Sequence, residues 1–305
     1  MQNRRNFLKA TAIMGAGSLV LPGAAKAFFA PTPHALGVQL FTLFDVIDAD
    51  TPGALQKLAA IGYTEIESAF SKQPGYYGRT PKEFAALCKS LGLSWKSHHV
   101  LGAPFKLPPG IKLPLGADGQ PMKFPAMKSL KDNMQELVDQ AAEGGISYLV
   151  CANTPTATLA EINSSIKVLN ETGEACKKVG IQLCYHNHDM EFKSVEGKIP
   201  YDLLLSETSS ANVKMELDLA WATHAKVNIP ALFAKHPGRF PLLHVKDINA
   251  DGKLGPVGSG IVDFKSVLAH AVKGGVKHYF VEHDSPKDGF ASLTESYKAL
   301  RNMGV

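Results

Sequence analysis

Four segments in the second half of the chain each carry two polar side chains spaced two residues apart, directly after an apolar run. The pairs are His186 and His188, Glu216 and Asp218, His244 and Lys246, and Glu282 and Asp284. In a strand, residues two apart point to the same face, so each pair would project from one side of a strand end. If the four ends meet, their imidazole, carboxylate and amino groups can bind a metal ion and transfer protons.

One residue from each pair completes a metal-ligand set. The predicted ligands are His186, Asp218, His244 and Glu282. A divalent ion with open coordination positions needs three or four nitrogen and oxygen ligands on rigid supports, and two imidazoles with two carboxylates suit Mn, Fe, Co or Zn better than Ca or Mg. A single polar residue at a strand end is more often a solvated loop neighbour. Four pairs in succession favour a shared site.

The other members of the pairs are expected to support the ligands or to contact a substrate. Glu282, His188 and Lys246 are the candidates for moving protons, and Glu216 and Asp284 are candidates for substrate contact. Glu282 therefore has two predicted roles, as a metal ligand and as a general base.

Elements that could position these residues alternate along the chain. Strand-like segments are expected at 36–43, 64–68, 94–100, 148–153, 181–189, 213–221, 242–249 and 278–284. Helix-like segments are expected at 51–61, 80–91, 128–144, 158–180, 201–209, 229–234, 263–274 and 291–303. Eight strand–helix units in this length predict a single (β/α)8 TIM barrel, with a doubly wound sheet as the competing α/β architecture. The barrel is favoured because its strand ends form one mouth, where four successive polar pairs would converge.

Residues 102–127 form a connection with six prolines and several glycines, which excludes a helix. Loops of this length in compact domains are often lids over an active site. The segment follows the third strand, on the expected mouth side, so it is predicted to be a lid-like insertion, with a subunit contact as the alternative.

Residues 1–27 are typical of an export signal. Arg4 and Arg5 lie in a twin-arginine-type sequence, an apolar stretch follows, and Ala25-Lys26-Ala27 offers small residues for cleavage. The apolar stretch is short for a membrane span, so no stable membrane anchor is expected after processing. The sequence predicts a catalytic domain at 28–305 that is exported to the periplasm.

The charge of that domain excludes several partners. The signal holds four of the 32 basic residues and no acidic residue, which leaves 28 basic and 28 acidic residues. A net charge of zero does not attract nucleic acid or an anionic membrane. The four cysteines show no ligand-like spacing, so buried thiols are expected, and Cys184 shares strand parity with His186 and His188 and could face the barrel interior.

Several short motifs together resemble the xylose-isomerase-like sugar phosphate isomerase/epimerase superfamily. They are Gly37-Val38-Gln39-Leu40, Tyr185-His186-Asn187-His188-Asp189, Leu217-Asp218-Leu219-Ala220-Trp221, His244-Val245-Lys246-Asp247 and the run from Val257 to Phe264. The resemblance implies a TIM barrel that performs metal-assisted chemistry on sugars. It also implies ligands at the ends of strands five to eight, which match His186, Asp218, His244 and Glu282.

One position departs from that pattern. Ketose 3-epimerases of the superfamily carry Glu where this chain has His186, and they use it as half of an acid/base pair. The histidine-rich strand is instead similar to inosose dehydratase. Both readings begin when a metal-held carbonyl is enolised to an enediolate. Isomerisation or epimerisation then follows from reprotonation, whereas elimination from a 3-keto-glycoside or keto-polyol would make the protein a lyase or hydratase.

Further residues and alternatives remain open. Glu67 and His99 could contact sugar hydroxyls or be solvated loop residues, and Trp221 could stack on a sugar ring or lie in the core. The loop at 255–260 is predicted to be a turn rather than a phosphate cradle. A non-catalytic exported sugar-binding protein is the alternative class, and the related endonuclease branch is disfavoured by charge and export. A homo-oligomer and a partner sugar dehydrogenase are both compatible with the sequence.

Overall fold

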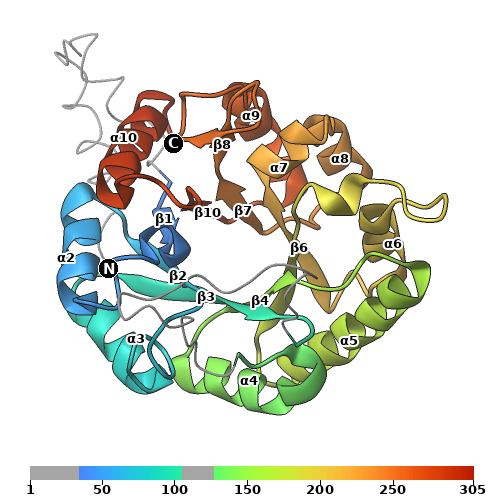
Figure 1. Cartoon of the computed structure of the whole chain (residues 1–305), viewed down its shortest axis with the longest axis horizontal. Helices are drawn as coiled ribbons and strands as arrows, with labels where there is room; N and C mark the ends of the chain where they lie inside the picture. The colour runs from blue at the N-terminus through green and yellow to red at the C-terminus, as the bar shows by residue number, and fades with distance from the viewer. Residues whose placement is uncertain (1–33, 105–126) are drawn as a thin grey trace, which may run out of the picture. The chain divides into compact units, whose positions relative to one another are not determined.

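The computed structural model describes residues 34–104 and 127–305, and their strands close a parallel barrel. The strands are β1 (Leu36–Gln39), β2 (Glu65–Ser68), β3 (Ser94–Leu101), β4 (Tyr148–Asn153), β5 (Gln182–His186), β6 (Val213–Asp218), β7 (Leu242–Val245) and β10 (His278–Val281). They neighbour one another in chain order, and β1 pairs with β10 to close the ring. The predicted single-domain TIM barrel is therefore confirmed, with its helices outside the strands (Figure 1).

The barrel helices are α2 (Thr51–Ile61), α3 (Pro81–Ser90), α4 (Leu130–Gly144), α5 (Leu159–Lys178), α6 (Pro200–Glu207), α8 (Ile229–Lys235), α9 (Phe264–Gly274) and α10 (Gly289–Asn302). All of them except α6 begin after a residue whose side chain caps the helix. Thr80 and Thr158 form capping boxes with the glutamates three residues later, and the Asp263 side chain caps α9 as expected. These caps satisfy amide groups that a helix start leaves free, which explains why most predicted helix bounds agree with the structure within one or two residues.

The predicted strands at the mouth were too long. β1 gives way to the 3-10 helix η1 (Leu40–Leu43), and β6 gives way to α7 (Leu219–His224). After β7, the short strand β8 (Asp247–Ile248) leaves the barrel and pairs with β9 (Leu254–Gly255). β5 and β10 likewise end at His186 and Val281. The apolar residues that follow remain buried over the barrel end, so the hydrophobic pattern does not mark where pairing stops.

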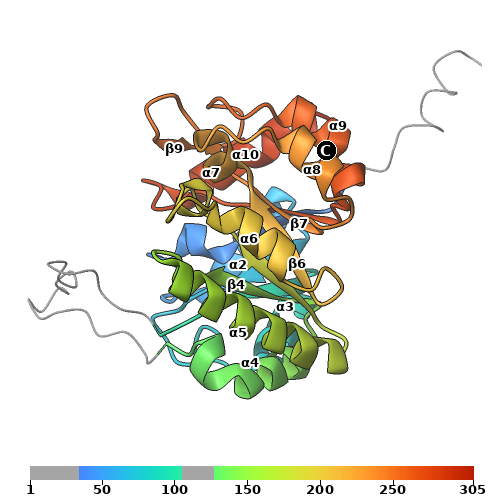
Figure 2. The same cartoon turned by 90° about the vertical axis from the view of Figure 1, so that its right-hand side faces the viewer.

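Side chains in the barrel interior form an apolar middle layer between two polar ends. Tyr148, Val150, Cys184, Leu242 and Phe280 form this buried cluster. The prediction that Cys184 faces the interior is confirmed, and all four cysteines are buried and free. The charged groups Glu65 and His278 lie toward one end of the barrel and Glu67 and His244 toward the other. Figure 2 shows the barrel from the side.

Two predicted segments lie outside the described residues. They are the export signal at 1–27 and nearly all of the lid-like insertion at 102–127. No helix in residues 34–104 or 127–305 is both long and apolar enough to cross a membrane.

Candidate metal and catalytic site

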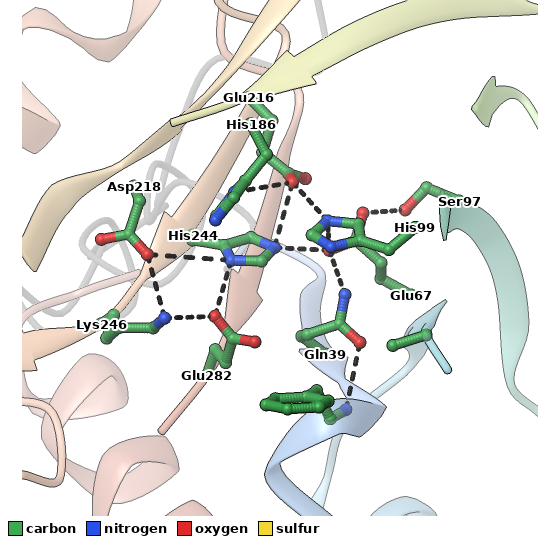
Figure 3. Close-up of polar contacts among 12 residues, drawn as sticks. Gln39, Glu67, Ser97, His99, His186, Glu216, Asp218, His244, Lys246 and Glu282 are labelled. Atoms are coloured by element: carbon green, nitrogen blue, oxygen red, sulfur yellow. Dashed lines mark hydrogen bonds and ion pairs between the residues drawn. The ribbon is translucent and has the colours of Figure 1, made fainter. Parts of the chain in front are cut away.

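Three of the four predicted metal ligands converge at the carboxyl ends of β6, β7 and β10 (Figure 3). His244 Nδ1 lies 2.9 Å from Glu282 Oε2 and 3.9 Å from Asp218 Oδ2. Asp218 and His244 have no exposed surface, and Glu282 is 5% exposed. One nitrogen and two carboxylates at this spacing can hold a divalent ion.

Local structure fixes the orientation of Asp218. Its Oδ1 accepts a hydrogen bond from Trp221 N at 2.9 Å, because Asp218 is the N-cap of α7. Its own amide donates to Asn187 Oδ1 at 3.1 Å. Oδ2 is buried, and it lies 3.1 Å from Lys246 Nζ and 3.9 Å from His244 Nδ1. A buried carboxylate oxygen in this position fits a cation ligand.

Lys246 places a positive charge among the same carboxylates. Its Nζ lies 3.1 Å from Asp218 Oδ2, 2.5 Å from Glu282 Oε2 and 2.9 Å from Asp284 Oδ2. Burial alone would lower the pKa of Lys246, but these three carboxylates hold the pKa well above its ordinary value. Burial opposes ionisation of Glu282 too, yet Lys246 and His244 hold its pKa well below the usual range. Lys246 therefore competes with any metal ion for the oxygens of Asp218 and Glu282.

Asp284 is the most exposed carboxylate of this group. Its side chain is 28% exposed, so it lies at the mouth. Burial and the charge of Glu282 raise the pKa of Asp284 to about 6, against the lowering effect of Lys246. A carboxyl group that changes protonation near neutral pH at an open site can act as an acid or a base.

A second group of potential ligands shares His244. Glu216 Oε2 lies 2.7 Å from His99 Nε2, 3.1 Å from His244 Nε2 and 3.2 Å from His186 Nδ1. All four residues are buried, and their ligand atoms lie within 4.8 Å of one another. The predicted ligand His186 thus belongs to this group, while His244 presents one ring nitrogen to each group.

Glu67 contacts two of these histidines, His244 and His99. It has no exposed surface, and its Oε1 lies 2.5 Å from His244 Nε2 and 3.3 Å from His99 Nε2. Gln39 Nε2 donates to the same oxygen at 2.9 Å, and Ser97 Oγ donates to Oε2. Glu67 and Glu216 are fully buried and contact histidines, and substrate contact by either residue stays a prediction.

Burial and the charges of neighbouring side chains shift the pKa values of Glu216, His99 and His186 in different directions. Burial and the neighbouring Glu67 raise the pKa of Glu216 to about 7. Burial would lower the pKa of His99, but Glu67 and Glu216 raise it to about 9. Burial, with His244 and His188, holds the pKa of His186 well below its usual value. His186 is therefore a neutral imidazole, the form that binds metals.

Two further predicted residues lie beside the mouth. The His188 ring is centred 5.0 Å from that of His186 and 6.3 Å from that of Trp221. Trp221 is partly buried with Lys246 Nζ 5.6 Å from its ring centroid, and its indole nitrogen has no hydrogen-bond partner among the described residues. An unpaired indole N–H beside the mouth is available to a substrate hydroxyl.

Sequence reasoning missed Asp247, which organises the loop beside the mouth. Its Oδ1 accepts from the amides of Ile248 and Val262, and its Oδ2 accepts from those of Gly258 and Gly260, at 2.8–3.2 Å. A Cβ at Gly260 would lie 2.4 Å from Asp247 Oδ1, so only glycine fits there. These amides are already used, so the loop is a turn, as predicted, and not a phosphate cradle. The motif His-Val-Lys-Asp was recognised, but nothing in it revealed this role.

Comparison with known proteins agrees with the fold. The sequence matches the xylose isomerase-like TIM barrel family over residues 55–303, and the chain belongs to this family. A sugar phosphate isomerase/epimerase from Parabacteroides distasonis is 26% identical, with a TM-score of 0.70 over 88% of this chain and 94% of that chain. No protein of curated function matches the sequence.

Two more distant structures show the same fold. L-ribulose 3-epimerase is 14% identical, with a TM-score of 0.65 over 89% of this chain and 94% of that chain. A probable 3-DHS dehydratase from Bacillus anthracis is 13% identical, with a TM-score of 0.65 over 88% of this chain and 98% of that chain. The fold thus occurs in proteins named for epimerisation and for dehydration.

Proposed function

We propose that this protein is a divalent-metal-dependent enzyme that enolises a keto-sugar or sugar derivative, with isomerisation or epimerisation as its overall reaction. The observation that carries the proposal is the convergence of Asp218, His244 and Glu282, whose buried ligand atoms lie within 4.8 Å of one another. Family membership agrees with it.

The donor atoms fit the metal that the family implies. Asp218 Oδ2, His244 Nδ1 and Glu282 would hold the ion, and the neutral His186 ring lies next to His244, with centroids 4.4 Å apart. Mn, Fe, Co or Zn suits this mixed set. A bound ion would supply Lewis-acid polarisation of a substrate carbonyl.

The chain's own groups would move the protons. Glu282 is held as a carboxylate by Lys246, so it carries no proton and can accept one from carbon next to a carbonyl, although the same ion pair weakens it as a base. Lys246 and His188 are the remaining candidates to return a proton to the substrate. Trp221 N–H and Asp284 would bind sugar hydroxyls at the mouth. Return of the proton to a neighbouring carbon gives isomerisation, and return to the opposite face gives epimerisation.

Elimination is the second candidate reaction, because of two observations. Asp284, with a pKa of about 6, could protonate a departing hydroxyl or alkoxide. His186 occupies the position where ketose 3-epimerases carry a carboxylate, which removes one half of their acid/base pair. The product would then be an unsaturated keto-sugar, and the enzyme a lyase or hydratase.

The location and partners of the enzyme are part of the proposal. Residues 1–27 would direct a folded, metal-loaded protein to the periplasm by the twin-arginine route. A small sugar is the proposed substrate, one that a sugar dehydrogenase would supply as its keto form. Self-association into a homo-oligomer is compatible with this role.

The decisive experiment combines metal analysis with proton exchange. Purified residues 28–305 should contain about one Mn, Fe, Co or Zn ion per chain. Keto-sugars incubated with the loaded protein in deuterium oxide should gain deuterium next to the carbonyl, with product analysis separating isomer, epimer and eliminated product. Tight binding of an unchanged sugar that is indifferent to chelation would instead establish a non-catalytic binding protein.

A further inference from the structure

His244 stands between two overlapping groups of potential ligands, and a neutral imidazole can serve only one of them. Its Nδ1 faces Glu282 at 2.9 Å and Asp218 at 3.9 Å. Its Nε2 faces Glu67 at 2.5 Å and Glu216 at 3.1 Å. A neutral ring has one lone pair and one N–H, so the nitrogen that keeps the proton is closed to a metal.

We propose that Glu67 is a positioning residue that keeps the proton of His244 on Nε2 and thereby commits Nδ1 to a metal ion held with Asp218 and Glu282. This inference rests on the proposed metal-dependent function. It assigns a role to a carboxylate that touches neither the ion nor the substrate.

Hydrogen bonds hold Glu67 in the orientation that this role requires. Gln39 Nε2 donates to Oε1 at 2.9 Å, and Ser97 Oγ donates to Oε2. Gln39 is itself oriented, because its Oε1 accepts from Phe41 N at 3.1 Å, which turns the amide nitrogen toward Glu67 (Figure 3). The carboxylate is fully buried and bonded on both oxygens, so it cannot turn away from His244.

The carboxylates that face the two ring nitrogens of His244 differ in how many other cations they contact. Glu282 on the Nδ1 side has a second cation, Lys246, 2.5 Å from the same oxygen. Within the described part of the chain, the ion pairs of Glu67 are with His244 and His99, and with no lysine or arginine. Loss of the Nε2 proton would leave a buried carboxylate facing a lone pair, which is strongly unfavourable. Lys246 lies 2.5 Å from the Glu282 oxygen, whereas His99 lies 3.3 Å from the Glu67 oxygen, so the Nδ1 proton of His244 is the easier one to lose.

As a consequence, His244 can complete only one of the two groups of potential metal ligands. With Nε2 protonated, His244 ligates through Nδ1 beside Asp218 and Glu282. His99, His186 and Glu216 then lose their fourth ligand and act as a support beneath the ion. A metal-binding histidine commonly donates its other ring N–H to a carboxylate in this way.

The test compares two carboxylates on the same strand. Glu67→Gln keeps the size of the side chain but removes its charge, and it should weaken Mn²⁺ or Zn²⁺ binding about 10–100-fold in equilibrium dialysis. Glu65→Gln is the matched control: Glu65 lies two residues away on the same face and contacts His278 instead. The control should bind the metal as tightly as the unaltered chain. Equal affinity in Glu67→Gln, or an equal loss in Glu65→Gln, would overturn the proposal.

A second variant and a spectroscopic measurement show whether Glu67 orients His244 or only maintains the fold. Gln39→Met leaves Glu67 intact but removes one of its two orienting donors, so it should weaken binding less than Glu67→Gln, about tenfold or below. Nitrogen-15 NMR of the zinc-loaded protein should show His244 with zinc on Nδ1 and hydrogen on Nε2. Zinc on Nε2 would refute the assignment.

The same spectrum distinguishes this inference from the proposed function. If the unaltered chain takes up no metal, the proposed function fails. In that metal-free protein, the His244 Nε2 proton should still appear far downfield, as expected for a strong hydrogen bond to a carboxylate. It should move upfield in Glu67→Gln and stay in place in Glu65→Gln. An unmoved signal in Glu67→Gln would mean that Glu67 does not hold this proton.

Discussion

Strand β2 carries two inward carboxylates, one toward each end of the barrel, and each is paired with a histidine. Near the amino end, Glu65 lies 2.7 Å from His278 Nδ1 and 3.8 Å from Lys96, whose side chain is 28% exposed. Near the carboxyl end, Glu67 is fully buried against His244 and His99. The same residue types, two positions apart, therefore form a partly solvated ion pair at one end and a closed network at the other.

The difference shows at which end the buried charges are not explained by a role in stability alone. Removing charges from water costs several kcal/mol per ion, and hydrogen bonds offset this only when every partner is in place. At the amino end Glu65 is also buried, but its partners His278 and Lys96 keep 17% and 28% of their side-chain surface exposed. The carboxyl end buries four carboxylates and two further histidines around His244, and this is the end where TIM barrels place their active sites.

The largest expected effect is the loss of metal from the carboxyl end. Asp218→Asn should reduce metal content from about one ion per chain to less than about a tenth, because a neutral amide oxygen replaces an anionic ligand. Elemental analysis after dialysis measures this. His278→Gln at the amino end should retain the full content. Full loading of Asp218→Asn would show that the Asp218, His244 and Glu282 group is not the site.

Removal of the proposed base should slow catalysis more than any accompanying loss of metal accounts for. Glu282→Gln should lower the rate of deuterium exchange into a substrate about 10²–10⁴-fold, since proton transfer by a positioned group contributes on that order. The metal content of the same preparation is the control, because residual metal separates loss of the base from loss of a ligand. Exchange at an unchanged rate would assign the base to another residue, with His188 the next to test.

Alanine variants on β2 compare the stability of the two ends. Glu67→Ala should lower the free energy of unfolding by about 3–5 kcal/mol, because it leaves protonated histidines buried without their partner. Glu65→Ala should cost less than this, because its partners His278 and Lys96 reach solvent and can be hydrated when the carboxylate is gone. Urea unfolding of both metal-free variants measures this, and equal losses would remove the distinction between the ends.

The smallest expected effect is a decline in the stability of the metal-free protein as the pH rises. The pKa of His99 is raised to about 9, so its contribution is complete below its ordinary value of 6.5 and is lost between pH 6.5 and 9. The raised pKa of Glu216, about 7, adds a loss between pH 4.5 and 7. Thermal unfolding across pH 5 to 9 measures the slope, which should flatten in His99→Gln. An unchanged slope in that variant would exclude His99 as its source.

Local signals in the sequence account for most of the helices and for the place of the candidate site. The predicted helix at 51–61 agrees with α2 because Asp50 caps its start and Gly62 ends it in a left-handed conformation. The polar pairs predicted the mouth because successive parallel strands end on one side of a barrel. Strand ends were less predictable, since Leu40 and Leu219 stay buried after pairing has stopped.

The sequence by itself determined which chemical groups gather at the carboxyl end of the barrel: histidines, carboxylates and a lysine after four successive strands. Only the tertiary structure decided how they divide. His186 lies with Glu216, Lys246 lies among the carboxylates, and Glu67 reaches His244 across 177 positions of the chain. Such contacts depend on the closure of the ring and the relative heights of its strands. Those are set by packing around the whole barrel, and no local spacing encodes them.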